Sequence, residues 1–108
     1  MKDDKIYIEH ILFAIAEIEK FTKNVSEEQF LSDTLVHSAV IRQFEIIGEA
    51  TKRLSPSTKA RDNDIPWRDI AATRDVLIHE YFAVNLEDVW DTIVNDLLLF
   101  KKAVENLK

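Results

Sequence analysis

Four side chains that can take part in proton transfer or phosphate binding lie close together in the second half of the chain. They are Arg74, Asp75, His79 and Tyr81. Histidine can accept or donate a proton near neutral pH, and arginine donates hydrogen bonds to phosphate oxygens. In a helix with about 100° per residue, Asp75 and His79 share one face, so the carboxylate can orient the imidazole. The alternative is an exposed helix with an Asp–His pair that has no catalytic role.

Helical geometry separates these side chains into two groups. Arg74 lies roughly 140° from His79 around an ideal helix, whereas Arg74 and Tyr81, seven residues apart, return to one face. A single helix therefore presents two adjacent polar edges. A compact site would need side chains that bend around the helix, or a second copy of the helix from another subunit.

Other candidate residues are weaker. His10 and His37 fall on separate predicted helices without the spacing of a zinc motif, and the chain has no cysteine, so we expect no metal site. The single glycine, Gly48, excludes a glycine-rich phosphate loop. Glu49 could reach a site from its helix, although a surface salt bridge is the simpler interpretation.

The composition is that of one soluble helical domain over residues 1–108. The chain is 46% hydrophobic and 31% charged, with a net charge of -6. This acidity argues against general nucleic-acid binding, although residues 42–74 hold seven basic and five acidic side chains. The acidic start is unlike a signal peptide and no apolar run is long enough to span a membrane, so we expect a cytoplasmic protein.

Apolar residues recur with helical spacing along most of the chain, which predicts an all-α fold. Ser26 begins a capping box, and Asp33 and Asn85 are suited to cap long helices. The aromatic residues in these helices, Phe44, Trp67, Trp90 and Phe100, are expected in the core. We predict helices over residues 5–23, 34–54, 66–81 and 86–104, a short helical turn after Ser26, and a polar loop over residues 55–64. Short connections between four helices favour an antiparallel four-helix bundle.

The segment Arg74-Asp75-x-x-x-His79-x-Tyr81 resembles the R-polar-x-x-x-H-x-Y signature of HEPN-domain proteins, specifically the HepT-like toxins of bacterial and archaeal toxin–antitoxin pairs. Residues 41–50, 65–67 and 88–90 also resemble that family, so the similarity spans essentially the whole chain. Two departures are mild: Ala72 stands where the family often has Gly, and Leu98 where Pro is frequent. Both could alter helix packing near the site.

The resemblance implies a metal-independent endoribonuclease that needs no cofactor and acts as a homodimer, with the signature helices of both subunits meeting at a shared cleft. Cleavage of RNA without metal needs a base near the 2′-hydroxyl, a cation for the phosphate and an acid for the leaving oxygen. On this interpretation His79 is the acid or base, Arg74 binds the phosphate, and Asp75 fixes the tautomer of His79.

The resemblance also implies a protein partner. Tyr81 stands at the position to which a minimal nucleotidyltransferase antitoxin of the MntA type transfers AMP, which neutralises the toxin. A tyrosine that packs its ring against the last helix is the simpler alternative. Two further alternatives for the whole chain are a non-catalytic helical module that binds a nucleotidyltransferase, and a structural dimer in which the motif has lost its activity.

Overall fold

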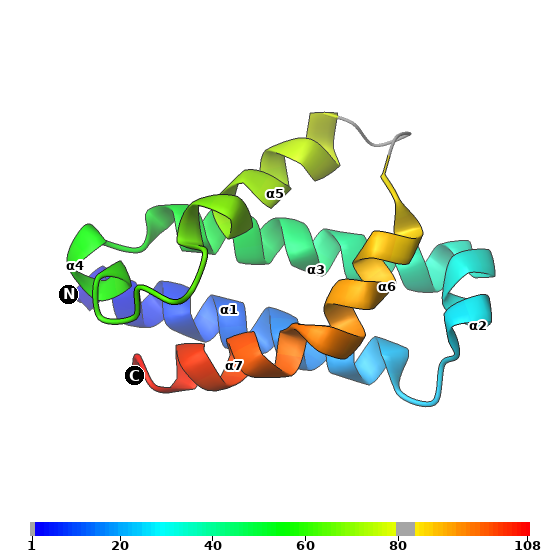
Figure 1. The fold of residues 1–108 in the computed structure, drawn as a ribbon, viewed down its shortest axis with the longest axis horizontal. Helices are drawn as coiled ribbons and strands as arrows, with labels where there is room; N and C mark the ends of the chain where they lie inside the picture. The colour runs from blue at the N-terminus through cyan, green and yellow to red at the C-terminus, as the bar shows by residue number, and fades with distance from the viewer. Residues whose placement is uncertain (1, 80–83) are drawn as a thin grey trace.

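The computed structural model describes residues 2–79 and 84–108, and every regular element in these two ranges is a helix (Figure 1). The helices are α1 (Lys2–Thr22), α2 (Glu27–Ser32), α3 (Thr34–Arg53), α4 (Pro56–Lys59), α5 (Trp67–His79), α6 (Leu86–Asn95) and α7 (Leu97–Glu105). The predicted all-α fold is confirmed. Within the same ranges, none of the helices is both long enough and apolar enough to cross a membrane.

The two longest helices, α1 and α3, lie antiparallel and form the base of the fold (Figure 1). Helix α7 runs along α1, and α2 turns the chain between α1 and α3 at one end. Helix α5 packs on α3, and its C-terminal end rises away from α3 (Figure 1). The helix with the proposed site residues is therefore supported mainly from one side.

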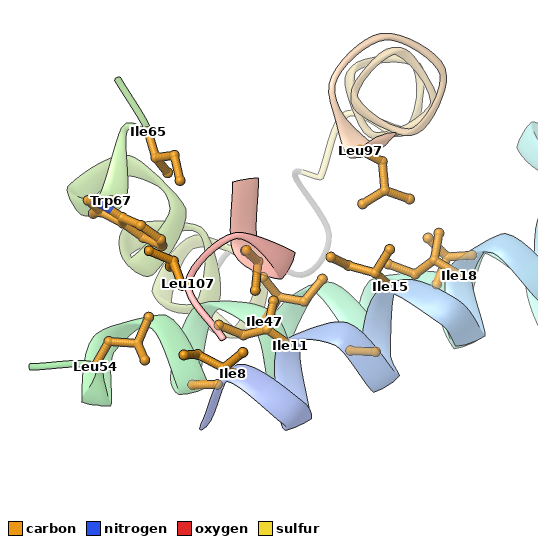
Figure 2. Packing of buried hydrophobic residues seen from close by; sticks show 14 of the residues in the cluster. Ile8, Ile11, Ile15, Ile18, Ile47, Leu54, Ile65, Trp67, Leu97 and Leu107 are labelled. Carbon is orange, nitrogen blue, oxygen red and sulfur yellow. The ribbon is translucent and has the colours of Figure 1, made fainter. Parts of the chain in front are cut away.

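The core is built on the predicted isoleucine stripe of α1. Ile8, Ile11, Ile15 and Ile18 are all buried, and they meet side chains from α3 and α7 (Figure 2). Burial of each such side chain contributes about 1.5–3 kcal/mol relative to an exposed position. The spacing of three, four and three residues places them on one face of α1, as the sequence predicts.

The four aromatic residues predicted for the core do contact it, to different degrees. Trp67 is buried, and its indole Nε1 donates to the carbonyl oxygens of Lys59 at 3.0 Å and Asp62 at 2.9 Å. Three others are partly exposed and pack against the buried cluster: Phe44, Trp90 and Phe100. Trp67 therefore also fixes the start of α5 relative to the preceding segment.

The predicted helix caps are present. Ser26 and Gln29 form the reciprocal capping box of α2. The Asp33 carboxylate accepts from the Val36 backbone N–H at 3.2 Å, and the Asn85 side chain caps α6. These interactions depend only on residues three apart in the sequence, which is why the pattern alone predicts them.

The polar loop predicted over residues 55–64 is wrong in part, because it contains the short helix α4. Ser55 caps this helix and Pro56 occupies its first turn. The carboxylate of Asp4, which is 4% exposed, accepts hydrogen bonds from the Ser55 N–H and from the hydroxyls of Ser55 and Thr58. Since Asp4 lies on α1, far away in the sequence, the local pattern gives no sign of it.

The single helix predicted over residues 86–104 is also wrong, since the chain bends at Asp96 between α6 and α7 (Figure 1). Asp96 has φ of -114° and ψ of -28°, outside the usual range for a regular α-helix. The Asp96 N–H still bonds the Thr92 carbonyl, and the Phe100 N–H bonds the Asp96 carbonyl, both at 3.0 Å. The helical apolar spacing therefore continues through the bend, which hides it from the sequence pattern.

Candidate active site

A close approach of two helix backbones sets the position of Arg74. Gly48 of α3 is buried against α5, and a Cβ at Gly48 would lie 2.7 Å from the Arg74 Cβ and 3.0 Å from the Arg74 backbone nitrogen. It would also lie 3.2 Å from the Ile70 carbonyl oxygen. Only a residue without a side chain allows this separation, so Gly48 determines how closely α5 approaches α3.

The Arg74 guanidinium is held by one carboxylate from each helix. Its Nε lies 3.4 Å from Glu49 Oε2 on α3, and its Nη1 donates to Asp75 Oδ1 at 3.1 Å on α5. Among the described side chains, none contacts Nη2. Because the Arg74 side chain is 34% exposed, the free edge of a fixed guanidinium is open to a ligand.

Two further cations on the last turn of α3 join this arrangement. Lys52 Nζ lies 3.6 Å from Asp75 Oδ1, and Arg53 donates through Nε to Glu49 Oε1 at 3.2 Å. The hydrogen bond from Arg74, and then the charge of Lys52, lower the pKa of Asp75. Hydrogen bonds to Tyr7 and then to Glu49 raise the pKa of Arg53. Both shifts favour the charged forms of Asp75 and Arg53.

The structure places the other predicted site residues only in part. Helix α5 continues to His79, one turn after Asp75, but the His79 side chain and the whole of Tyr81 lie outside the described residues. The contact predicted between Asp75 and His79 stays a prediction. His10 is exposed, and His37 is half-buried with its Nδ1 3.0 Å from the Phe30 carbonyl oxygen.

The sequence analysis did not single out Lys52 and Arg53. Basic residues in the last turn of a helix are usually explained by the helix dipole and by intrahelical pairs. The surface salt bridge expected for Glu49 is present, and Arg53 is one of its partners. The link from Glu49 to Arg74 joins two helices through the contact at Gly48, so sequence spacing cannot reveal it.

A second surface lies between α5 and the last two helices. An apolar groove of about 850 Å³ runs between α5, α6 and α7 over part of α3. Its walls include Ile47, Ile70, Val89 and Leu97, and its rim includes Val76 and Leu99, which are 48% and 68% exposed. An isolated chain would expose this apolar surface to water, which is unfavourable.

The comparison with protein families agrees with this architecture. The ribonuclease HepT-like family matches residues 11–107, a range that includes Arg74 and the charged residues around it, Glu49, Lys52, Arg53 and Asp75. The chain belongs to the ribonuclease HepT-like family. Among the described residues of this HepT-like chain, no group of three His, Cys, Asp or Glu side chains is placed to hold a metal ion.

Several proteins are similar to this HepT-like chain. "Probable ribonuclease HepT" of Thermococcus cleftensis is 42% identical over 107 residues, which cover 99% of this chain and 97% of that protein. "Putative RNase" of Caldanaerobacter subterraneus subsp. tengcongensis is 38% identical over 107 residues, with 99% and 96% coverage.

A third relative is longer than this chain. "Gamma-glutamylcyclotransferase and putative RNase" of Methanocaldococcus jannaschii is 42% identical over 103 residues. The match covers 95% of this chain but only 46% of that protein, so the chain spans about half the length of this relative. No solved structure matches the chain.

Proposed function

We propose that this HepT-like ribonuclease is a metal-independent endoribonuclease in which Arg74 binds the scissile phosphate and His79 transfers protons. The observation that carries the proposal is the fixed guanidinium of Arg74. Two carboxylates hold its Nε and Nη1, no side chain in the described part of the chain pairs with Nη2, and His79 follows five residues later on the same helix. A preorganised cation and a histidine are two kinds of group that the cleavage of a phosphodiester needs.

The chemistry needs no group beyond these side chains and the RNA. A base removes the proton of a ribose 2′-hydroxyl, and the 2′-oxygen attacks the adjacent phosphorus. The bond from phosphorus to the 5′-oxygen of the next nucleotide breaks, and an acid protonates that oxygen. His79 of one or both subunits supplies the base and the acid, while Arg74 binds the phosphate oxygens as negative charge increases on them.

Asp75 and Glu49 are positioning residues in this proposal. Glu49 contacts the Arg74 guanidinium from α3, and Asp75 contacts it from α5. Asp75 also lies one turn before His79 and is suited to accept a hydrogen bond from its imidazole, which would select one tautomer. Neither carboxylate is proposed to touch the RNA.

A second copy of the chain is proposed to cover the apolar groove and complete the site. Helix α5 packs extensively on α3, and the apolar rim at Val76 faces away from that contact. Val76 and His79 are three residues apart, so they occupy neighbouring positions on the surface of α5. A dimer contact at Val76 therefore brings the two copies of His79 towards one cleft. Light scattering tests this assembly, and a fully active monomer would exclude it.

We also propose the biological role that the family signature implies, a toxin neutralised by a nucleotidyltransferase of the MntA type. Tyr81 lies seven residues after Arg74, and AMP attached to its hydroxyl would add a phosphodiester charge and a base. That phosphate could bind Arg74 by a charge-assisted hydrogen bond and occupy the place of the RNA phosphate. Modification would then block substrate binding without unfolding the protein.

Cleavage of RNA by purified protein in the presence of EDTA tests the enzymatic proposal. Arg74→Ala should lower kcat/KM by about 10²–10³, as for loss of a main electrostatic stabiliser. Arg68→Ala is the matched control, because Arg68 is an exposed arginine of the same helix. The proposal fails if EDTA abolishes cleavage, or if Arg74→Ala and Arg68→Ala cleave at the same rate. A protein that does not cleave RNA but binds a nucleotidyltransferase would support the non-catalytic alternative.

A further inference from the structure

Five charged side chains form a linear series across the contact between α3 and α5. In order they are Arg53, Glu49, Arg74, Asp75 and Lys52, and neighbouring members lie 3.2, 3.4, 3.1 and 3.6 Å apart. We refer to this series as the ion-pair chain. Signs alternate along it, so both ends are positive.

The ion-pair chain carries a local charge of +1 in a protein whose net charge is -6. Each carboxylate is shared between two cations, so neither neutralises its partners fully. The terminal cations are also the most accessible, because the side chains of Arg53 and Lys52 are 58% and 48% exposed. Within the ion-pair chain, Arg53 and Lys52 each pair with one carboxylate, and each has further N–H donors that can bind a ligand.

We propose that Lys52 and Arg53 bind the RNA phosphates that flank the phosphate held by Arg74. The inference rests on the proposed function, since it extends the RNA site from the scissile phosphate to its neighbours. Backbone phosphates are the anions that a partly neutralised Lys or Arg side chain binds well, and Arg can do so with two hydrogen bonds. Together with Arg74, Lys52 and Arg53 would give this acidic protein a short row of cations that binds the RNA backbone.

The ion pairs of Lys52 and Arg53 are compatible with binding of RNA phosphates. Exposed ion pairs of this kind contribute only about 0–1 kcal/mol, so a phosphate can compete with the carboxylates at small cost. In the free protein, Glu49 and Asp75 hold the three cations next to one another at the contact between α3 and α5. The RNA backbone then meets cations that are already in position, which reduces the entropy lost on binding.

The experiment measures binding of a short fluorescent single-stranded RNA of mixed sequence in EDTA, with His79→Ala as the parent protein so that the probe is not consumed. The variants are Lys52→Gln and Arg53→Gln. The control is Lys20→Gln, because Lys20 is exposed and makes a single 4.0 Å ion pair with Glu17 on α1. Thermal unfolding confirms that each variant is folded.

The expected result is a change in salt dependence. Each lost phosphate contact should reduce the slope of log K against log salt by about 0.7, the value for single strands. Affinity falls as salt rises from about 50 to about 200 mM, and the factor by which it falls should be about two- to threefold smaller for each variant than for the parent. Lys20→Gln should keep the parent slope.

Unchanged slopes for both Lys52→Gln and Arg53→Gln would overturn the inference, even if cleavage in the wild-type background is slower. Failure of the proposed function has a different signature. A wild-type protein that does not cleave RNA in EDTA, but whose variants show the reduced slopes, has the phosphate sites without the nuclease. The two proposals can therefore fail separately.

Discussion

The contact at Gly48 predicts a variant whose activity falls far more than its stability. In Gly48→Ala the new methyl carbon would lie 2.7 Å from the Arg74 Cβ. An ordinary contact between carbon atoms is about 3.5–4.0 Å, so the two helices must separate by roughly 1 Å. Two of the three close atoms belong to the α5 backbone, so a change of side-chain rotamer cannot relieve the contact.

The effects on stability partly cancel. Overpacking of a helix contact costs about 1–3 kcal/mol, whereas replacing Gly by Ala inside a helix gains about 1 kcal/mol. The free energy of unfolding of Gly48→Ala should therefore fall by about 0–2 kcal/mol. A 1 Å displacement of Arg74 should nevertheless reduce kcat/KM by about 10²-fold, the loss expected for misplaced catalytic groups.

The assay combines urea unfolding with initial rates of RNA cleavage at a temperature where both proteins are folded. Ile18→Val is the matched control, because it should lose about 0.5–1.5 kcal/mol from a fully buried position without moving α5. Its activity should stay at the wild-type level. Wild-type activity in Gly48→Ala would show that the close approach of α5 does not position Arg74, and the reasoning would be wrong.

Three further outcomes are expected, one from the structure and two from the proposed function. Asp4→Ala should lower the free energy of unfolding by about 1–3 kcal/mol at pH 7, because a buried carboxylate that accepts hydrogen bonds from Ser55 and Thr58 is lost. Those hydrogen bonds lower the pKa of Asp4, so the stability that Asp4 contributes is present above the ordinary pKa of 3.8 and is lost as the pH falls through the pKa in the folded protein. Chemical denaturation of the wild type and Asp4→Ala at several pH values should show that the difference between their free energies of unfolding shrinks below pH 3.8. A difference that stays constant with pH would refute this. Coexpression of Arg74→Ala with His79→Ala should restore roughly a quarter of wild-type cleavage if one subunit supplies the arginine and the other the histidine of each site, whereas inactive mixtures would place both in one subunit. Coexpression with a cognate nucleotidyltransferase should add AMP to the wild-type protein, detected by intact mass, and Tyr81→Phe should remain unmodified and toxic; modification of another residue would exclude Tyr81.

Local sequence features predicted most of the helices for a physical reason. The isoleucine stripe of α1 and the caps at Ser26, Asp33 and Asn85 involve residues only three or four apart, and such interactions are recorded directly in the sequence. Helix α4 escaped prediction because its stabilising partner, Asp4, is on α1. The bend at Asp96 escaped because the apolar period continues across it.

In the candidate site too, the sequence predicts the local features and not the contacts between helices. The spacing of Arg74, Asp75 and His79 on one helix is visible in the sequence, and the family resemblance gives it a chemical meaning. The contacts from Glu49 and Lys52 depend on how α3 and α5 cross. That crossing is set by the absence of a side chain at Gly48, and no periodic pattern encodes which helix will approach a glycine.

The central claim is that one histidine at the end of α5 carries out proton transfer in RNA cleavage. The most direct test is the single-turnover rate of RNA cleavage by His79→Ala and wild-type protein, in EDTA and with saturating enzyme. His10→Ala serves as the control, since His10 is an exposed histidine of α1. The account predicts that His79→Ala is slower by about 10²–10⁴ while RNA binding is retained. Cleavage by His79→Ala at the wild-type rate would contradict it.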